Sequence, residues 1–103
     1  MKMGKPAIIK RLEASNLTKF QKRVLTETFK IPKGETRSYK QIAEAAGRPN
    51  AYRAVGSVMK MNPFAPTIPC HRVIKSSGEL GNYSAPGGTR KKMQMLKEEK
   101  ALA

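Results

Sequence analysis

Apolar residues recur at helical spacing in the stretch that begins near residue 18. Thr18 and Gln21 have the spacing of a capping box, in which the two side chains satisfy free backbone N–H groups at the start of a helix. Pro32 and Gly34 then end the pattern. The positions that share one face are Phe20, Val24, Leu25, Thr28 and Phe29. The pattern predicts a core helix.

Two shorter helices are predicted directly after it. Ser38 and Gln41 repeat the capping-box spacing, and Gly47 ends the first of these helices. After a turn in which Asn50 is the expected N-cap, the second helix covers residues 51–61. The positions expected to face the core are Ile42, Ala43, Ala46, Ala51, Ala54, Val55, Val58 and Met59. Two short helices joined by a tight turn predict a helix-turn-helix.

The remaining pattern indicates a wing and two terminal segments. Val73-Ile74 and the return segment 80–84 predict a small β-hairpin. A last helix is expected over residues 90–100, capped by Thr89, with Met93 and Leu96 turned inward. Residues 1–15, whose apolar side chains are Ile8, Ile9 and Leu12, suit either a short packed helix or a frayed basic arm. We therefore expect a mainly α, winged helix-turn-helix-like domain over residues 16–103, preceded by a basic segment.

The charge of the chain points to a polyanionic partner. Lys and Arg total 21 against 7 acidic residues, which gives a net charge of +14 spread along the whole sequence. Nucleic acid explains this excess best, although a membrane surface would also attract it. We expect no membrane association, because no apolar run reaches transmembrane length and residues 1–15 lack the apolar core of a signal peptide. The expected location is the cytoplasm, in association with the nucleoid DNA, or the nucleus if the protein is eukaryotic.

The second helix of the predicted pair offers a surface for DNA. Its side opposite the core carries Tyr52, Arg53, Gly56, Ser57 and Lys60. Gly56 and Ser57 keep that face slim, which allows close approach to a backbone, and Arg53 and Lys60 supply positive charge. An ordinary solvated helix face is the alternative interpretation.

The only cysteine and the only histidine are adjacent, at Cys70 and His71. A neighbouring histidine favours the reactive thiolate. Adjacent strand residues point to opposite faces, so the backbone must turn here or a water must join the two side chains. Pro69 and the prolines before it predict an irregular backbone here, because proline breaks helices and strand ladders. The alternative interpretation of the pair is a buried, inert cysteine beside a surface histidine. One cysteine and one histidine exclude an intrachain disulfide and a metal-ligand cluster, and we expect no metal and no cofactor.

These motifs, in this order, resemble one family. The segments that carry the resemblance are Ser38-Tyr39, Tyr52-Arg53-Ala54-Val55-Gly56, Asn62-Pro63, Pro69-Cys70-His71-Arg72-Val73-Ile74, Gly81-Asn82-Tyr83-Ser84, Gly87-Gly88 and Glu99. Over residues 17–99 the chain resembles the C-terminal active-site domain of the O6-alkylguanine-DNA alkyltransferases, the methylated-DNA–protein-cysteine methyltransferases. Members of that family usually carry a further N-terminal domain. We expect activity to remain possible without it, at some cost in stability.

The resemblance implies a reaction and a role for each residue. Cys70 takes the alkyl group from O6 of guanine irreversibly, so each molecule acts once. His71 accepts the thiol proton through a water, and Glu99 (or its neighbour Glu98) orients the imidazole. Two further residues complete the catalytic set. Asn62 supports the turns around the site, and Tyr39 donates a hydrogen bond near N3 of the leaving purine. The residues implied to line the base pocket are Val73, Tyr83 and Ser84, and Arg72 is expected to be structural.

The resemblance also implies how DNA is bound. A monomer places the helix with Arg53 in the minor groove of a duplex that contains O6-alkylguanine, and Arg53 fills the space of the flipped-out base. The slim surface at Ala54, Gly56 and Ser57 suits a narrow groove. The alternative function is a non-enzymatic basic helix-turn-helix protein that binds DNA or senses lesions. A thiol-dependent hydrolase is a weaker third possibility.

Overall fold

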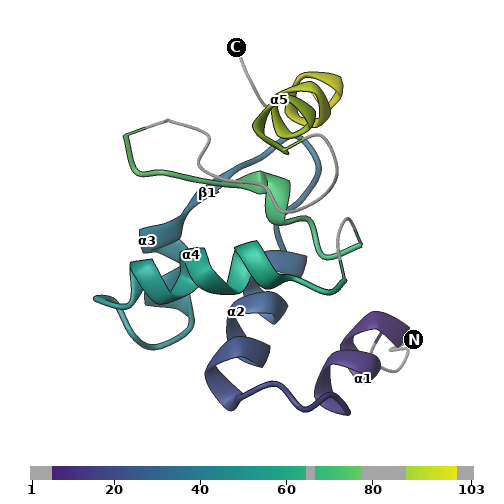
Figure 1. Ribbon diagram of the computed structural model, residues 1–103, viewed down its shortest axis with the longest axis vertical. Coiled ribbons are helices and arrows are strands. Elements are labelled where there is room, and N and C mark those ends of the chain that lie inside the picture. Colours follow the sequence, from purple (N-terminus) through teal and green to yellow (C-terminus); the bar gives the residue numbers. More distant parts are fainter. Residues whose placement is uncertain (1–5, 65–66, 78–87, 100–103) are drawn as a thin grey trace, which may run out of the picture.

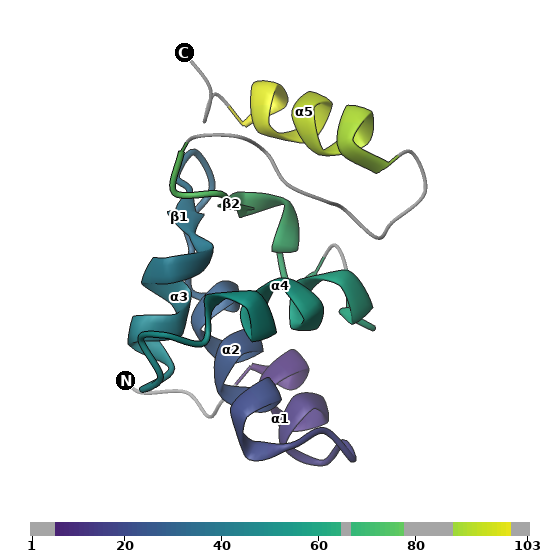
Figure 2. The same ribbon diagram turned by 60° about the vertical axis from the view of Figure 1, so that its left-hand side comes forward.

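The computed structural model describes residues 6–64, 67–77 and 88–99. Its described elements, in chain order, are α1 (Ala7–Glu13), α2 (Lys19–Phe29), β1 (Arg37–Ser38), α3 (Tyr39–Ala45), α4 (Tyr52–Met61), the 3₁₀ turn η1 (Cys70–Arg72), β2 (Val73–Ile74) and α5 (Gly88–Glu98). Helices α2, α3 and α4 pack against one another, and α5 contacts η1. Figures 1 and 2 show α5 on one side of the strands and the three packed helices on the other. The expected mainly α, helix-turn-helix-like fold is confirmed.

Both capping boxes are present and begin the helices where the sequence places them. Thr18 accepts from the Gln21 backbone N–H, and Ser38 does the same for Gln41, with each glutamine side chain bonded back to the cap residue. Gly47, at φ +85°, lies just after α3. The N–H groups of Gly47 and Arg48 donate to the carbonyls of Glu44 and Ala43, the pattern of a Schellman motif. Local chemistry therefore defines both ends of α3.

The first segment of the chain forms α1 rather than a frayed arm. Ile9 and Leu12 are buried against the core, and Ile8 is half-buried. The Arg11 guanidinium lies 5.6 Å from the centroid of the Phe64 ring, which joins α1 to the loop after α4. The short-helix interpretation of residues 1–15 is thus confirmed for the described part, Ala7–Glu13.

Three local predictions about the helices are wrong. Ala51, not Asn50, is the N-cap of α4, and it makes no side-chain cap bond because its methyl group has no acceptor. Ala54 is exposed, because the core-facing side of α4 is set by Val55, Val58 and Met59. Helix α5 begins at Gly88, one residue before Thr89.

The inward face of α5 also differs from the prediction. Met93 is 41 % exposed, whereas Lys92 is fully buried. Lys92 lies one helical turn before the buried Leu96 and therefore shares its face, and its ammonium group finds a hydrogen-bond acceptor inside the domain. The Val73 carbonyl accepts a hydrogen bond from Lys92, and this contact accompanies burial of the lysine where the hydrophobic pattern predicted Met93.

The strand at Val73–Ile74 is confirmed, but its described partner is distant in sequence. β1 and β2 pair in parallel, with Arg37 opposite Val73 and Ser38 opposite Ile74. The return segment 80–84 of the expected hairpin lies outside the described residues. This pairing sets the start of α3, and therefore Tyr39, beside the segment that follows Cys70.

Candidate active site and nucleic-acid interface

The loop between α4 and Cys70 is held by one side chain. The Asn62 amide donates to the Ile68 carbonyl over 3.0 Å and accepts from the Phe64 backbone N–H over 2.9 Å. The Cys70 N–H then donates to the Ile68 carbonyl at 2.8 Å, and the Arg72 N–H donates to the Pro69 carbonyl at 2.9 Å. The backbone therefore turns at Cys70, as expected for an irregular segment after Pro69.

Cys70 is buried, with 2 % of its surface exposed. Burial raises the pKa of its thiol, because a thiolate loses the solvation of water. A hydrogen bond from Asn62 and the positive charge of Lys92 act in the opposite direction and lower that pKa. A thiol in this setting needs a base to become a nucleophile.

His71 is equally buried and is held by Glu99. Its Nε2 lies 2.9 Å from Glu99 Oε2. An ionised carboxylate only accepts, so Nε2 carries the proton and Nδ1 keeps the lone pair. Burial lowers the pKa of His71 and outweighs the opposing effect of Glu99. At neutral pH the ring is therefore a neutral base with its basic nitrogen, Nδ1, inside the domain.

Arg72 fixes the carboxylate that holds the histidine. Its Nε and Nη2 donate to the two oxygens of Glu99, each over 2.8 Å, and Nη1 donates to the Ile31 carbonyl over 2.8 Å. These bonds lower the pKa of Glu99 to about 2, with the bond to Arg72 contributing most. Glu98 is exposed and accepts a bond from Gln94 instead, so the partner of His71 is Glu99. Arg72 thus makes a structural contact, as expected.

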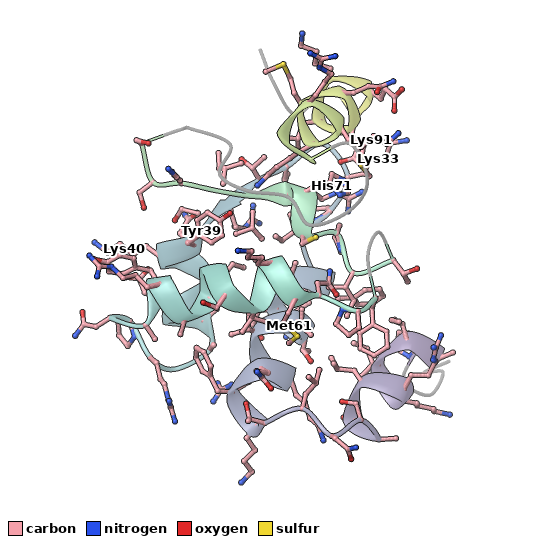
Figure 3. All side chains as sticks on the ribbon, in the orientation of Figure 1. Lys33, Tyr39, Lys40, Met61, His71 and Lys91 are labelled. Carbon is pink, nitrogen blue, oxygen red and sulfur yellow. The ribbon has the colours of Figure 1, made fainter. Side chains whose placement is uncertain are left out.

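Tyr39 is the first residue of α3 and faces the same region. Burial raises the pKa of its phenol, and the negative charge of a Cys70 thiolate raises it further. The phenol therefore stays protonated at neutral pH and is available as a hydrogen-bond donor. Figure 3 shows Tyr39 below the segment that carries β2 and His71 at η1, where that segment begins.

Lys92 is a further side chain of this region, and the sequence pattern does not single it out. Its Nζ donates to the Val73 carbonyl over 2.6 Å and lies 5.8 Å from the centroid of the Tyr39 ring. Burial lowers the pKa of this ammonium to about 8. The only sequence signal was its position one turn before Leu96, on the face that packs inward.

A groove of about 520 Å³ lies along α4. The five residues expected to contact DNA all line it, together with four from α3 and the segment after β2: Tyr39, Lys40, Tyr52, Arg53, Gly56, Ser57, Lys60, Lys75 and Ser76. Tyr52 is exposed. A Cβ added at Gly56 would meet no atom within 4 Å in the described part of the chain, so packing within the domain does not require a glycine there.

The predicted base-pocket residues divide between the described and undescribed parts. Val73 is buried at the start of β2, whereas Tyr83 and Ser84 lie outside the described residues. Among the described residues, no group of three or more His, Cys, Asp or Glu side chains is placed to hold a metal ion. Within the same ranges, no helix has the length and apolar character needed to cross a bilayer.

The fold and the groove define a small basic helix-turn-helix domain with a buried cysteine beside a neutral histidine. Residues 19–101 match the family model described as 6-O-methylguanine DNA methyltransferase, DNA binding domain. The chain belongs to this family. It is 51 % identical over 83 residues to a methylated-DNA–protein-cysteine methyltransferase of Mycobacterium leprae, a match that covers 81 % of this chain and 49 % of that protein.

Two solved structures are similar to the domain. A crystal structure of Mycobacterium tuberculosis OGT in complex with DNA matches with a TM-score of 0.78 and 48 % identity, over 84 % of this chain and 52 % of that one. A structure of S. pombe Atl1 in complex with damaged DNA containing O6-carboxymethylguanine matches with a TM-score of 0.72 and 30 % identity, over 82 % and 79 %. The chain spans about half the length of the curated relatives it matches.

Proposed function

We propose that this chain is the C-terminal active-site domain of an O6-alkylguanine-DNA alkyltransferase, and that Cys70 takes an alkyl group from O6 of guanine in DNA. The observation that carries the proposal is the ordered set of side chains at η1. A buried thiol adjoins a neutral imidazole, and a carboxylate 2.9 Å from Nε2 orients that imidazole. This is the nucleophile, base and orienting group that thiol activation needs. The names of the curated relatives support the same activity.

The reaction begins with the thiol proton. It passes to His71 Nδ1 through a bridging water, and Glu99 stabilises the resulting imidazolium. The Cys70 sulfur then forms a bond to the alkyl carbon, the bond from that carbon to O6 breaks, and its electron pair stays on the guanine. Tyr39 donates a hydrogen bond near N3 and offsets the charge that develops on the purine. The guanine finally takes up one proton. The thioether product is stable, so each molecule acts once.

The target atom lies inside the DNA stack, so the base must leave it before Cys70 can react. In this proposal α4 enters the minor groove of the duplex, and Arg53 occupies the space that the flipped base leaves. Tyr52, Ser57 and Lys60 contact the DNA backbone beside it. Gly56 allows close approach because it has no side chain, and packing within the described domain does not itself require a glycine there. The base is held near Val73, Tyr83 and Ser84. The domain acts as a monomer.

The decisive experiment is the intact mass of the protein after mixing with a duplex that contains one O6-methylguanine. We expect a gain of one methyl group, mapped by peptide analysis to Cys70. The Cys70→Ala variant should bind the same duplex and gain no mass. If the folded, DNA-binding wild-type protein gains no methyl group, the proposal fails and lesion sensing or architectural DNA binding takes its place. Methyl transfer retained by Cys70→Ala would exclude Cys70 as the acceptor.

A further inference from the structure

The side chain of Lys92 is completely buried, with its ammonium group fixed at the segment that carries the nucleophile. Nζ donates to the Val73 carbonyl over 2.6 Å. The Val73 N–H in turn donates to the Cys70 carbonyl, which closes η1. The backbone of η1 and β2 therefore fixes the position of the ammonium group relative to Cys70.

A buried ammonium is costly for the fold. Transferring such a charge out of water is strongly unfavourable unless other groups compensate, and an apolar side chain of similar length would often stabilise a core as well or better. Burial accordingly lowers the pKa of Lys92 to about 8, while the charge of a Cys70 thiolate raises it. At neutral pH most molecules still carry the positive charge. Packing alone gives no reason to keep it there.

The groups around Lys92 identify what its charge acts on. On η1, the charge of Lys92 interacts with Cys70, whose pKa it lowers, and with His71, whose protonated form it disfavours. From α3 the Tyr39 ring lies beneath it, with its centroid 5.8 Å from Nζ. The carboxylate of Glu99 is already bound by His71 and Arg72. Among the groups that the structure describes, the anion coupled to Lys92 is therefore the thiolate of Cys70.

We propose that Lys92 is a positioning residue that holds a fixed positive charge beside Cys70, and thereby stabilises the thiolate from the interior of the domain. This deepens the proposed function and rests on it for its biological purpose. His71 takes the proton, and Lys92 keeps its own proton throughout. The charge also disfavours a second positive charge on the neighbouring imidazole, so the proton that His71 accepts must be stabilised by Glu99.

The first test is the pH dependence of Cys70 alkylation by iodoacetamide, in which the thiolate sulfur bonds to carbon and iodide leaves. The chain has one cysteine, so cysteine labelling, followed by intact mass, reports Cys70 alone. The variants are Lys92→Met, which removes the charge, and Lys92→Gln, which keeps a donor for the Val73 carbonyl. The matched control is Lys91→Met, an exposed position on the same helix that lies away from Tyr39 in Figure 3.

In both neutral variants we expect the pH dependence of the alkylation rate to shift to higher pH by about one unit. Alkylation at neutral pH then becomes about tenfold slower. Lys91→Met should follow the wild-type profile. Lys92→Arg should show a smaller shift than the neutral variants, because it keeps a positive charge. Urea unfolding separates charge from packing, because Lys92→Gln removes the buried charge but keeps a donor for the Val73 carbonyl, and it should not lower the midpoint. Folded Lys92→Met and Lys92→Gln proteins with the wild-type profile would overturn the proposal.

A second test needs no substitution. Coupling between two groups is reciprocal, so converting Cys70 to a neutral thioether must lower the pKa of Lys92 if the thiolate is its partner. Side-chain NMR of Lys92 before and after iodoacetamide treatment measures this change, and an unchanged pKa would contradict the proposal even if every variant unfolded. Neither test uses DNA. A failure of methyl transfer from DNA is therefore distinguishable from a failure of the Lys92 proposal.

Discussion

His71 Nε2 and Glu99 Oε2 lie 2.9 Å apart although 28 residues separate them in the sequence. The contact forms because the C-terminal end of α5 packs on η1. Arg72 completes it by binding both oxygens of the same carboxylate. Glu99 therefore both orients the imidazole and joins the last described segment of the chain to the candidate active site.

Replacing Glu99 should impair transfer more than DNA binding. Glu99→Gln keeps the size of the side chain but removes the charge that stabilises the imidazolium, and it allows the wrong imidazole tautomer. We expect methyl transfer to slow by about 10²-fold, within the range for loss of general base catalysis. The measurement is single-turnover transfer from duplex O6-methylguanine, alongside the affinity for an unmodified duplex. Glu98→Gln, one residue earlier and exposed, is the control and should transfer at the wild-type rate. Equal losses of transfer and binding in Glu99→Gln would indicate a purely structural role.

The same carboxylate should make the stability of the domain depend on pH. The pKa of Glu99 is lowered to about 2 in the folded state, so its contribution is complete above its unfolded pKa and is lost as the pH falls toward 2. The lowered pKa of His71 acts in the same direction, because folding opposes its protonation. We expect Glu99 to account for about 2 kcal/mol of the wild-type loss in unfolding free energy between about pH 5 and pH 2. Urea unfolding at several pH values measures it. A Glu99→Gln curve parallel to that of the wild type would refute this assignment.

Loss of Asn62 should loosen the loop that leads to Cys70. Asn62→Ala leaves the Ile68 carbonyl and the Phe64 N–H without their side-chain partner, which should lower the free energy of unfolding by about 1–3 kcal/mol. It also removes a hydrogen bond that lowers the pKa of Cys70, so alkylation should slow at neutral pH. Urea unfolding and iodoacetamide kinetics test the two effects. Asn50→Ala, at an exposed position that caps no helix, should change neither. Unchanged stability of Asn62→Ala would show that the loop does not depend on this amide.

Arg53 should matter most when the target base is paired. It is exposed on α4 and lines the groove there. If it fills the space of a flipped base, Arg53→Ala should slow transfer from a duplex by about tenfold or more, with a smaller effect on single-stranded DNA, because less unstacking is needed there. Lys30→Ala removes one positive charge at a position outside this groove and controls for general attraction to phosphate. An equal slowing on duplex and single-stranded substrates would assign Arg53 to phosphate contact alone.

Several features of the domain follow from the sequence because their causes are local. The capping boxes at Thr18 and Ser38 place two helix starts, and Gly47 supplies the positive φ that ends α3. The adjacency of Cys70 and His71 after Pro69 indicated the candidate reactive segment and predicted its turn. The net charge indicated a polyanionic partner, which we propose to be DNA. Each of these signals lies within a few residues, where backbone geometry and side-chain chemistry act directly.

Other features depended on contacts between distant segments. The two-residue strand β1 has no pattern of its own and exists because it pairs with β2. The choice of Glu99 over Glu98 depended on how α5 sits on η1, and the burial of Lys92 in place of Met93 depended on a carbonyl acceptor at Val73. Hydrophobic periodicity finds the face of a helix but cannot show which polar group meets a partner on it. The sequence therefore determined the helices and the candidate nucleophile, and the tertiary structure decided which charges surround it.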